Sequence, residues 1–271
     1  MTTTTVQAPG TFSWFELATT DQDAAKRFYG ALFNYEIFDS PIGPDEVYTL
    51  LKLQGRDAGA LFKMSEKNYP PGTPPHWMPY LSVESADQTA EKVKAAGGKV
   101  MAEPFDVMEH GRMAVCMDPL GAAFCVWQAK QHSGVAVRGE PGAFAWCQLN
   151  APSTGREEAK RFYGEVFGWT YRDDPMAMGD SYTTWLGQEG GTGQSQVRGG
   201  MMPIPPGVQA PAHWLIYFAS DDVDESAARA RLSGGQIMVP GTDIPGMGRF
   251  AVLQDPQGAF FAVVKFAKPV A

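Results

Sequence analysis

Side chains that could do acid–base chemistry occur at matched positions in the two halves of the chain. Glu16 and His76 in the first half are matched by Gln148 and His213 in the second. A carboxylate can act as a general base and an imidazole as a general acid, provided that burial raises the pKa of the carboxyl toward the working pH. The same side chains could instead only hydrogen-bond within the protein. Glu16 and His76 are therefore candidate catalytic residues, with a structural role as the alternative.

Aromatic side chains recur at matched positions as well. They supply stacking area for a planar organic ligand and carry a polar handle that can orient it. Core packing competes with this interpretation, because a tryptophan on the inner face of a strand is ordinarily buried in the core. The residues predicted to bind a ligand are Trp14, Trp77, Tyr80, Trp146, Gln148, His213, Trp214 and Tyr217.

These matches belong to a repeat that covers most of the 271 residues. Lys26-Arg27-Phe28-Tyr29-Gly30 returns as Lys160-Arg161-Phe162-Tyr163-Gly164, and Asp118-Pro119 returns as Asp255-Pro256. A long internal repeat indicates that one module has been duplicated and fused. We expect a disordered tail over residues 1–9, a first module over 10–128, a linker over 129–140 and a second module over 141–271.

Each module itself contains one pattern twice: a strand, a helix and three further strands. In the first unit a strand over Phe12–Thr19 precedes a helix that we expect to begin at Thr20. The apolar face of this helix is predicted to consist of Ala24, Phe28, Leu32 and Phe33. The other helices are expected to begin at Ser85, Thr154 and Asp222. The predicted fold is α+β: four βαβββ units that form cupped mixed sheets with the helices outside.

The repeated elements resemble a known superfamily. Two motifs look like those of the vicinal oxygen chelate proteins. They are Phe-Tyr-Gly in the first helix of each module and the closing Asp-Pro-x-Gly-Ala-x-Phe at 118–124 and 255–261. That superfamily comprises glyoxalase, bleomycin-resistance and extradiol dioxygenase proteins. Within it, the tandem arrangement is similar to a two-module actinobacterial group labelled antigen or hydroxylase. The Asp-Pro-x-Gly element is expected to be a tight hairpin turn.

The resemblance implies a divalent metal held by side chains of the first, fifth and eighth strands of a module. Those positions are occupied by Trp14, Met78 and Cys125 in the first copy and by Trp146, Leu215 and Ala262 in the second. An indole N–H only donates, and the Met and Cys sulfurs suit soft ions. We therefore predict no metal site and no cofactor. The alternative is a displaced metal site, two residues along the strands, that uses Glu16 and His76 with a third ligand.

Composition limits the partners. The formal net charge of -8 and the pI near 5.0 argue against nucleic acid and anionic membranes, and mildly favour a neutral or cationic ligand. No apolar run is long enough to span a bilayer. The three cysteines do not form a paired pattern, so reduced thiols and a cytoplasmic location are expected.

The second module also contains loop segments that the first lacks or shortens. Four segments are candidate lids over a pocket: the glycine-rich Gly187–Gly200, the methionine-containing Met176–Met178 and Met201–Met202, and the proline-rich Pro203–Pro211. Flexible surface loops would have the same composition.

The predicted function is binding, with or without transformation, of a small and planar organic molecule in an aromatic pocket without the usual metal. The alternatives are a metal-dependent lyase, isomerase or dioxygenase, and a non-catalytic interaction scaffold. Because the two modules are fused, they can pair with each other within one chain. We therefore expect a monomer with an internal pseudo-dimer, or a homodimer.

Overall fold

The fold comes from a computed structural model of the chain, which describes residues 7–44, 46–176, 181–187, 196–205 and 207–268. The first module consists of β1 (Phe12–Thr19), α1 (Gln22–Phe33), β2 (Glu36–Pro41), β3 (Val47–Leu53), β4 (Arg56–Lys63), β5 (His76–Ser82), α2 (Ala86–Ala95), β6 (Lys99–Val107), β7 (Gly111–Met117) and β8 (Ala123–Ala129). The second consists of β9 (Phe144–Ala151), a 3₁₀ turn (Ser153–Gly155), α3 (Arg156–Phe167), β10 (Thr170–Pro175), β11 (Ser181–Leu186), β12 (Val197–Pro203), β13 (His213–Ala219), α4 (Val223–Leu232), β14 (Gln236–Ile244), β15 (Gly248–Gln254) and β16 (Phe260–Phe266).

Each module forms one eight-stranded mixed sheet. The strand order is β2-β3-β4-β1-β5-β8-β7-β6 in the first and β10-β11-β12-β9-β13-β16-β15-β14 in the second. In both sheets the two βαβββ units join through an antiparallel pair of first strands, β1 with β5 and β9 with β13. The predicted fold of four βαβββ units in two tandem modules is confirmed.

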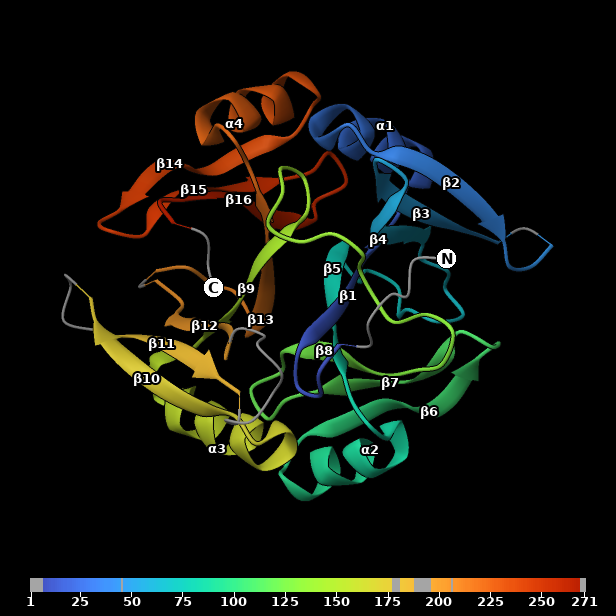
Figure 1. Cartoon of the computed structure of the whole chain (residues 1–271), viewed down its shortest axis with the longest axis vertical. Helices are drawn as coiled ribbons and strands as arrows, with labels where there is room; N and C mark the ends of the chain where they lie inside the picture. Colours follow the sequence, from blue (N-terminus) through green and yellow to red (C-terminus); the bar gives the residue numbers. More distant parts are fainter. Residues whose placement is uncertain (1–6, 45, 177–180, 188–195, 206, 269–271) are drawn as a thin grey trace.

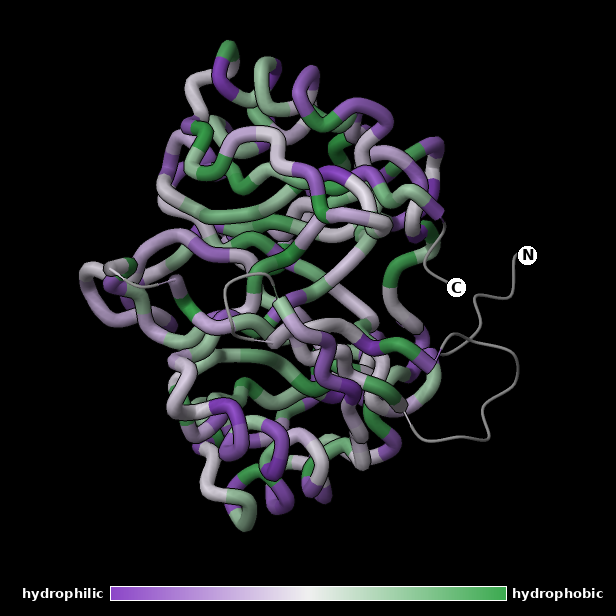
Figure 2. Tube along the Cα trace, turned by 90° about the vertical axis from the view of Figure 1, so that its left-hand side faces the viewer, coloured by the Kyte–Doolittle hydropathy of each residue, from purple (hydrophilic) through white to green (hydrophobic). Residues whose placement is uncertain are grey.

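The two sheets lie back to back. Strands β1, β5, β9 and β13 occupy the centre of the molecule, and the helices lie outside, with α1 next to α4 and α2 next to α3 (Figure 1). The helices lie at the top and bottom of the view in Figure 2, where apolar and polar residues alternate along them. An amphipathic helix buries its apolar stripe against a sheet, which accounts for this arrangement.

Two of the four helix starts differ from the prediction. Helix α1 begins at Gln22, because the Asp21 carboxylate accepts the hydrogen bond from the Ala24 amide at 2.9 Å. The residues of α1 that are buried are Ala25, Phe28, Tyr29, Leu32 and Phe33, so Ala25 rather than Ala24 faces the core. Thr154 lies inside the 3₁₀ turn, so α3 begins after Gly155 without a side-chain cap.

The other two starts are confirmed. Ser85 accepts from the Gln88 amide at 3.2 Å and Asp222 accepts from the Glu225 amide at 2.9 Å. Both caps satisfy one of the amides that the first turn of a helix leaves without a partner.

The segment between the two sheets packs against the first module. The Val135 amide donates to the Ser13 carbonyl at 2.8 Å, and the Ala136 amide donates to the Asp57 carbonyl at 2.7 Å. Val135 and Val137 are buried. The predicted linker therefore follows a fixed path along the sheet.

Of the predicted tail and lids, residues 1–6, 177–178, 188–195 and 206 lie outside the described residues. The prediction of loops was wrong for Val197–Pro203, which forms strand β12 because it pairs with β9 and β11. The Gln7 carbonyl, at the start of the described chain, accepts a hydrogen bond from the Ser82 hydroxyl at 2.9 Å. Cys116, Cys125 and Cys147 are buried free thiols. None of the helices in the described part of the chain has the length and apolarity that a membrane span requires.

Candidate functional site

The face of the first sheet that carries Glu16 is here termed the inner face of the first module. Across the antiparallel β1–β5 ladder, Glu16 pairs with Met78 and Trp14 pairs with Tyr80, so these four side chains share a face. His76 lies two residues before Met78 on β5 and belongs to the same face. The structure thus brings together Trp14, Glu16, His76 and Tyr80 from the predicted set.

Trp77 and Trp214 lie on the opposite faces of their sheets. The Trp77 indole donates to the Tyr29 hydroxyl of α1 at 3.0 Å, and the Trp214 indole donates to the Tyr163 hydroxyl of α3 at 3.0 Å. Both rings belong to the core between sheets and helices. The reason is the two-residue period of a strand, which turns residues 77 and 80 to opposite faces.

Glu16 lies in a hydrogen-bonded network of aromatic side chains. The Tyr48 hydroxyl donates to Glu16 Oε2 at 2.9 Å, and the Tyr80 hydroxyl donates to Glu16 Oε1. The Trp14 indole in turn donates to the Tyr48 hydroxyl at 2.9 Å. Glu16 is 9 % exposed, and burial raises the pKa of its carboxyl while the Tyr80 and Tyr48 hydrogen bonds oppose the rise. This is an environment in which a carboxyl can hold or release a proton.

His76 is placed at the edge of this network. Its Nδ1 donates to the Pro74 carbonyl at 2.8 Å, so in the neutral ring the lone pair is on Nε2. Its ring contacts Tyr69 edge to face, with 5.7 Å between the centroids, and burial lowers the pKa of His76. Glu16 hydrogen-bonds to the two tyrosines rather than to His76, so the two candidates share a face without forming a direct acid–base pair.

The second module replaces the carboxylate by an amide. Gln148 Nε2 donates to Asn150 Oδ1 at 2.9 Å, and Asn150 Nδ2 lies 3.1 Å from His213 Nε2. The Trp146 indole donates to the Tyr182 hydroxyl at 2.8 Å, as Trp14 does to Tyr48. Tyr217 pairs with Trp146 across the β9–β13 ladder. The inner face of the second module therefore holds a chain of hydrogen-bonded polar side chains without a carboxylate.

The residues present do not fit the metal that the resemblance implies. Among the described residues, no three His, Cys, Asp or Glu side chains gather closely enough to hold an ion. Within the described part of the chain, Glu16 and His76, the candidates for a displaced site, have no third such ligand beside them. Burial raises the pKa of Cys125 well above its usual value, which disfavours the thiolate that binds metals.

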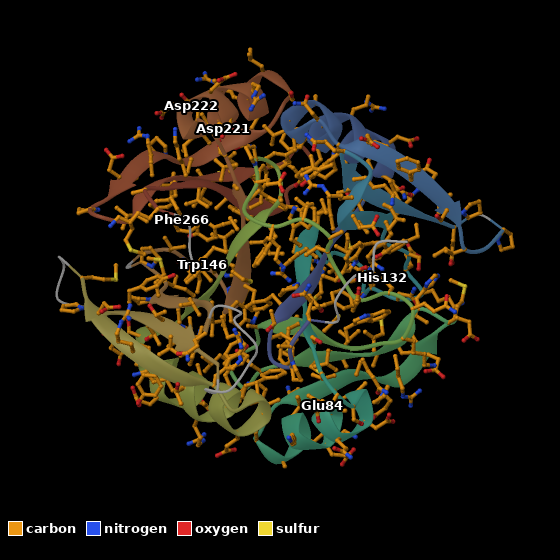
Figure 3. The ribbon with its side chains drawn as sticks, viewed as in Figure 1. Glu84, His132, Trp146, Asp221, Asp222 and Phe266 are labelled. Carbon is orange, nitrogen blue, oxygen red and sulfur yellow. The ribbon has the colours of Figure 1, made fainter. Side chains whose placement is uncertain are left out.

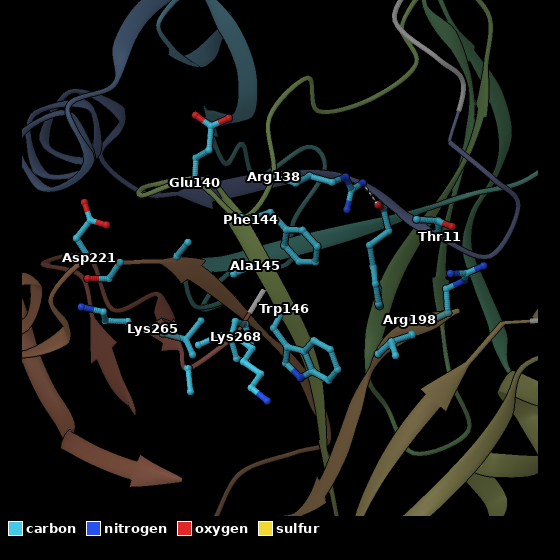
Figure 4. Close-up of a pocket in the computed structure, with 18 of the residues that line it drawn as sticks. Thr11, Arg138, Glu140, Phe144, Ala145, Trp146, Arg198, Asp221, Lys265 and Lys268 are labelled. Carbon is cyan, nitrogen blue, oxygen red and sulfur yellow. Dashed lines mark hydrogen bonds between the residues drawn. The ribbon is translucent and has the colours of Figure 1, made fainter. Parts of the chain in front are cut away.

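A pocket of about 720 Å³ opens beside the second module (Figure 4). Its aromatic lining consists of Phe12, Phe144, Trp146 and Phe266, with 6.2 Å between the ring centroids of Trp146 and Phe266. Charged side chains surround these rings: Arg138, Glu140, Arg198, Asp221, Lys265 and Lys268. Of the predicted ligand-binding residues, Trp146 lines this pocket.

Two residues of the predicted linker were missed as site residues. Arg138 lines the pocket of the second module. His132 contacts the Trp14 ring edge to face, with 4.5 Å between the centroids. Neither residue belongs to the repeat, so comparing the sequences of the two modules does not identify it. His132 and Trp146 lie in opposite halves of the molecule (Figure 3).

Comparison with protein families matches both modules. The model described as "Glyoxalase/Bleomycin resistance protein/Dioxygenase superfamily" covers residues 11–126 and 148–263. "Putative glyoxylase CFP32" of Mycobacterium bovis is 41 % identical over 257 residues, which are 94 % of this chain and 95 % of that protein. "Anthracycline biosynthesis protein DnrV" of Streptomyces peucetius is 34 % identical over 274 residues, 95 % of this chain and 94 % of that protein.

Solved structures share the fold at low identity. The Mn(II)-bound glyoxalase from Novosphingobium aromaticivorans has a TM-score of 0.64 and 22 % identity, over 97 % of this chain and 84 % of that one. The 2,3-dioxygenase LapB from Pseudomonas sp. KL28 has a TM-score of 0.65 and 12 % identity, over 98 % and 96 %. At these identities the likeness concerns the fold alone.

Proposed function

Because the chain belongs to the glyoxalase/bleomycin resistance protein/dioxygenase superfamily, we propose that it binds a small, planar organic molecule in the pocket beside its second module. The observation that carries this proposal is the pocket of about 720 Å³ with Phe144, Trp146 and Phe266 in its lining. Pockets of roughly 300–1,000 Å³ that combine aromatic surface with a few polar groups are typical sites for small molecules.

The relatives support a polycyclic aromatic compound as the ligand class. One of them, 34 % identical, is named for anthracycline biosynthesis. A fused planar ring system would stack on Trp146, and the polar groups around it would orient its substituents. The pocket is open to the charged side chains of β12 and β16, which leaves room for such substituents.

The repeat offers a matched test. We would titrate 1,8-dihydroxyanthraquinone into the protein and follow quenching of tryptophan fluorescence, for wild type, Trp146→Phe and Trp14→Phe. Both substitutions remove an indole that donates to a tyrosine at the same place in its module. We expect binding to weaken on the order of tenfold in Trp146→Phe and to stay unchanged in Trp14→Phe. Equal affinities for the two variants would show that the compound does not bind at Trp146.

A second candidate function is proton abstraction by Glu16 on the inner face of the first module. It is favoured by the buried carboxylate, whose pKa is raised by burial, with two tyrosine hydroxyls bonded to it. Carboxylates in such surroundings act as general bases for acidic C–H groups.

This second candidate can be tested with 5-nitrobenzisoxazole, a probe of general-base strength. Removal of its ring C–H proton breaks the N–O bond and releases a coloured nitrophenolate. Wild type should accelerate the ring opening and Glu16→Gln should not, whereas His76→Gln should retain the activity. An unchanged rate in Glu16→Gln would rule out Glu16 as the base.

A further inference from the structure

We propose that the pocket beside the second module recognises an aromatic carboxylate, with the carboxylate group held by Arg138 and Arg198 and the ring placed on Trp146. This inference rests on the proposed ligand-binding pocket and names the chemical class of the ligand. Two guanidinium groups in one pocket suit a carboxylate, because each can donate paired N–H groups to its oxygens.

Arg138 has a hydrogen-bond donor that a ligand could use. One of its terminal nitrogens donates to the Phe12 carbonyl, and the guanidinium lies over the Phe144 ring at 5.2 Å from the centroid (Figure 4). Its Nε is buried and has no hydrogen-bond partner among the described residues. A buried donor without a partner is costly, and a ligand oxygen would satisfy it.

Arg198 brings a second positive charge to the same pocket. It is in β12, and its guanidinium lies against Gly187, where an added Cβ would come within 2.4 Å of its Nη2. Glycine at 187 therefore leaves the space that the Arg198 head group occupies. Burial and the charge of Arg198 lower the pKa of Arg138 to about 10, so Arg138 is still cationic at neutral pH. An anion between two like charges relieves their repulsion.

The other charges of the pocket favour an anion as well. Lys265 and Lys268 add two cations. Of the two carboxylates, Glu140 is engaged by Arg56, whose Nη1 and Nη2 donate at 2.7 and 2.6 Å. The whole chain has a net charge of -8, so this pocket departs from the acidic character of the protein. The overall composition had mildly favoured a neutral or cationic ligand, and the local charge of the pocket favours an anionic one.

The aromatic surface selects a ring over inorganic phosphate. Phe144 is held in place by stacking on Phe15 of the first module, with 4.0 Å between the centroids and 17° between the planes. Trp146 is held by its hydrogen bond to Tyr182. Rings with fixed orientations present a preorganised surface, which reduces the entropy lost on binding.

The test compares two ligands of the same shape by titration calorimetry: 2-naphthoate, which is anionic, and naphthalene-2-carboxamide, which is neutral. We expect wild type to bind 2-naphthoate at least tenfold more tightly, because charge-assisted hydrogen bonds to two arginines are lost in the amide. Raising the KCl concentration from 50 to 500 mM should weaken the binding of 2-naphthoate more than that of the amide.

Variants then locate the site. Arg138→Gln and Arg198→Gln should each weaken 2-naphthoate on the order of tenfold and leave the amide within twofold of wild type. Arg27→Gln, an exposed position on α1, is the matched control and should bind both ligands as wild type does. Circular dichroism checks that each variant is folded, and the wild-type comparison of the two ligands does not depend on any variant.

The outcomes separate this inference from the proposed function. Equal affinity of wild type for 2-naphthoate and the amide would overturn the carboxylate assignment while leaving the pocket as a binding site. If wild type binds none of the three compounds (2-naphthoate, its amide and 1,8-dihydroxyanthraquinone), both the carboxylate assignment and the proposed function are overturned. Inorganic phosphate that displaces 2-naphthoate at equal concentration would show that the ring contributes nothing.

Discussion

The hydroxyl of Tyr29 donates a hydrogen bond to Asp255 Oδ2 at 3.0 Å, from helix α1 of the first module to the Asp-Pro turn of the second. Tyr163 and Asp118 make the same contact in the opposite direction, also at 3.0 Å. Each aspartate uses its other oxygen to accept backbone amides of its own turn. The residues that mark the repeat in the sequence therefore join the two modules.

Removal of one of these hydroxyls should destabilise the whole protein. Tyr29→Phe leaves a buried Asp255 oxygen without its donor and the Trp77 indole without its acceptor, so we expect a loss of about 1–3 kcal/mol in the free energy of unfolding. Tyr163→Phe should cost a similar amount. Urea denaturation followed by tryptophan fluorescence measures both.

Tyr171→Phe provides the control, because Tyr171 is 46 % exposed and the substitution keeps its ring. It should change the free energy of unfolding by less than about 0.5 kcal/mol. If Tyr29→Phe costs no more than Tyr171→Phe, the contact between the modules does not contribute to stability.

The buried Glu16 carboxyl should make stability depend on pH in a defined direction. Burial raises its pKa above the ordinary value of 4.5. Below pH 4.5 the group is protonated in both the folded and the unfolded chain, and above it the unfolded chain ionises first. Wild type should therefore lose stability relative to Glu16→Gln as the pH rises from 4.5 through the raised pKa of Glu16. Urea unfolding of both proteins between pH 4 and pH 8 gives the difference.

Gln148→Glu is the matched variant in the second module. It places a carboxyl at the position that corresponds to Glu16, next to Leu215 in the β9–β13 register. This variant should lose stability relative to wild type over a similar pH range.

For the comparison of wild type with Glu16→Gln, parallel curves of stability against pH would mean that Glu16 has the same pKa in the folded and unfolded chains.

Tyr80 should hold down the pKa of Glu16. Its hydroxyl donates to Glu16 Oε1, and this hydrogen bond opposes the effect of burial. In Tyr80→Phe the pKa of Glu16 should rise further, so the pH range over which Glu16 costs stability extends upward. The measurement compares Tyr80→Phe with the double variant Tyr80→Phe/Glu16→Gln. Tyr217→Phe changes the corresponding residue beside Gln148. In this variant, the effect of Glu16→Gln on the free energy of unfolding should cover the same pH range as in wild type.

His132 should contribute a second pH dependence, of the opposite sign. Burial lowers its pKa below the ordinary value of 6.5. As the pH falls below 6.5, the unfolded chain is protonated first, and wild type should lose stability relative to His132→Gln until the pKa of the folded state is passed. Unfolding midpoints between pH 8 and pH 5 measure this. A constant difference across that range would show that burial leaves the titration of His132 unchanged.

Much of the fold could be predicted from short-range patterns. The helix caps at Ser85 and Asp222 follow from residues three positions apart, and the two βαβββ units of each module follow from strand and helix periods. The cap at Asp21 differs from the expected one at Thr20 because several residues near a helix start can accept the same amide. The sequence pattern does not indicate which of these residues caps the helix.

The candidate site was predictable only in part. The alternation of a strand places Trp14 and Glu16 on one face, and the same rule separates Trp77 from Tyr80. Tyr48 was not predicted beside Glu16, because the two are brought together across the sheet from β3 and β1. The arginines of the pocket come from the linker and β12, and no local pattern connects them.

The duplication, the order of the elements and the face of each strand could be predicted from the sequence alone, since these depend on residues close together in the chain. The hydrogen bond from Tyr29 to Asp255, the two tyrosines that share Glu16, and the meeting of Arg138 and Arg198 in one pocket become visible only in the folded molecule. Those contacts depend on how sheets curve and on how two modules pack, which is fixed by the combined packing of many distant side chains.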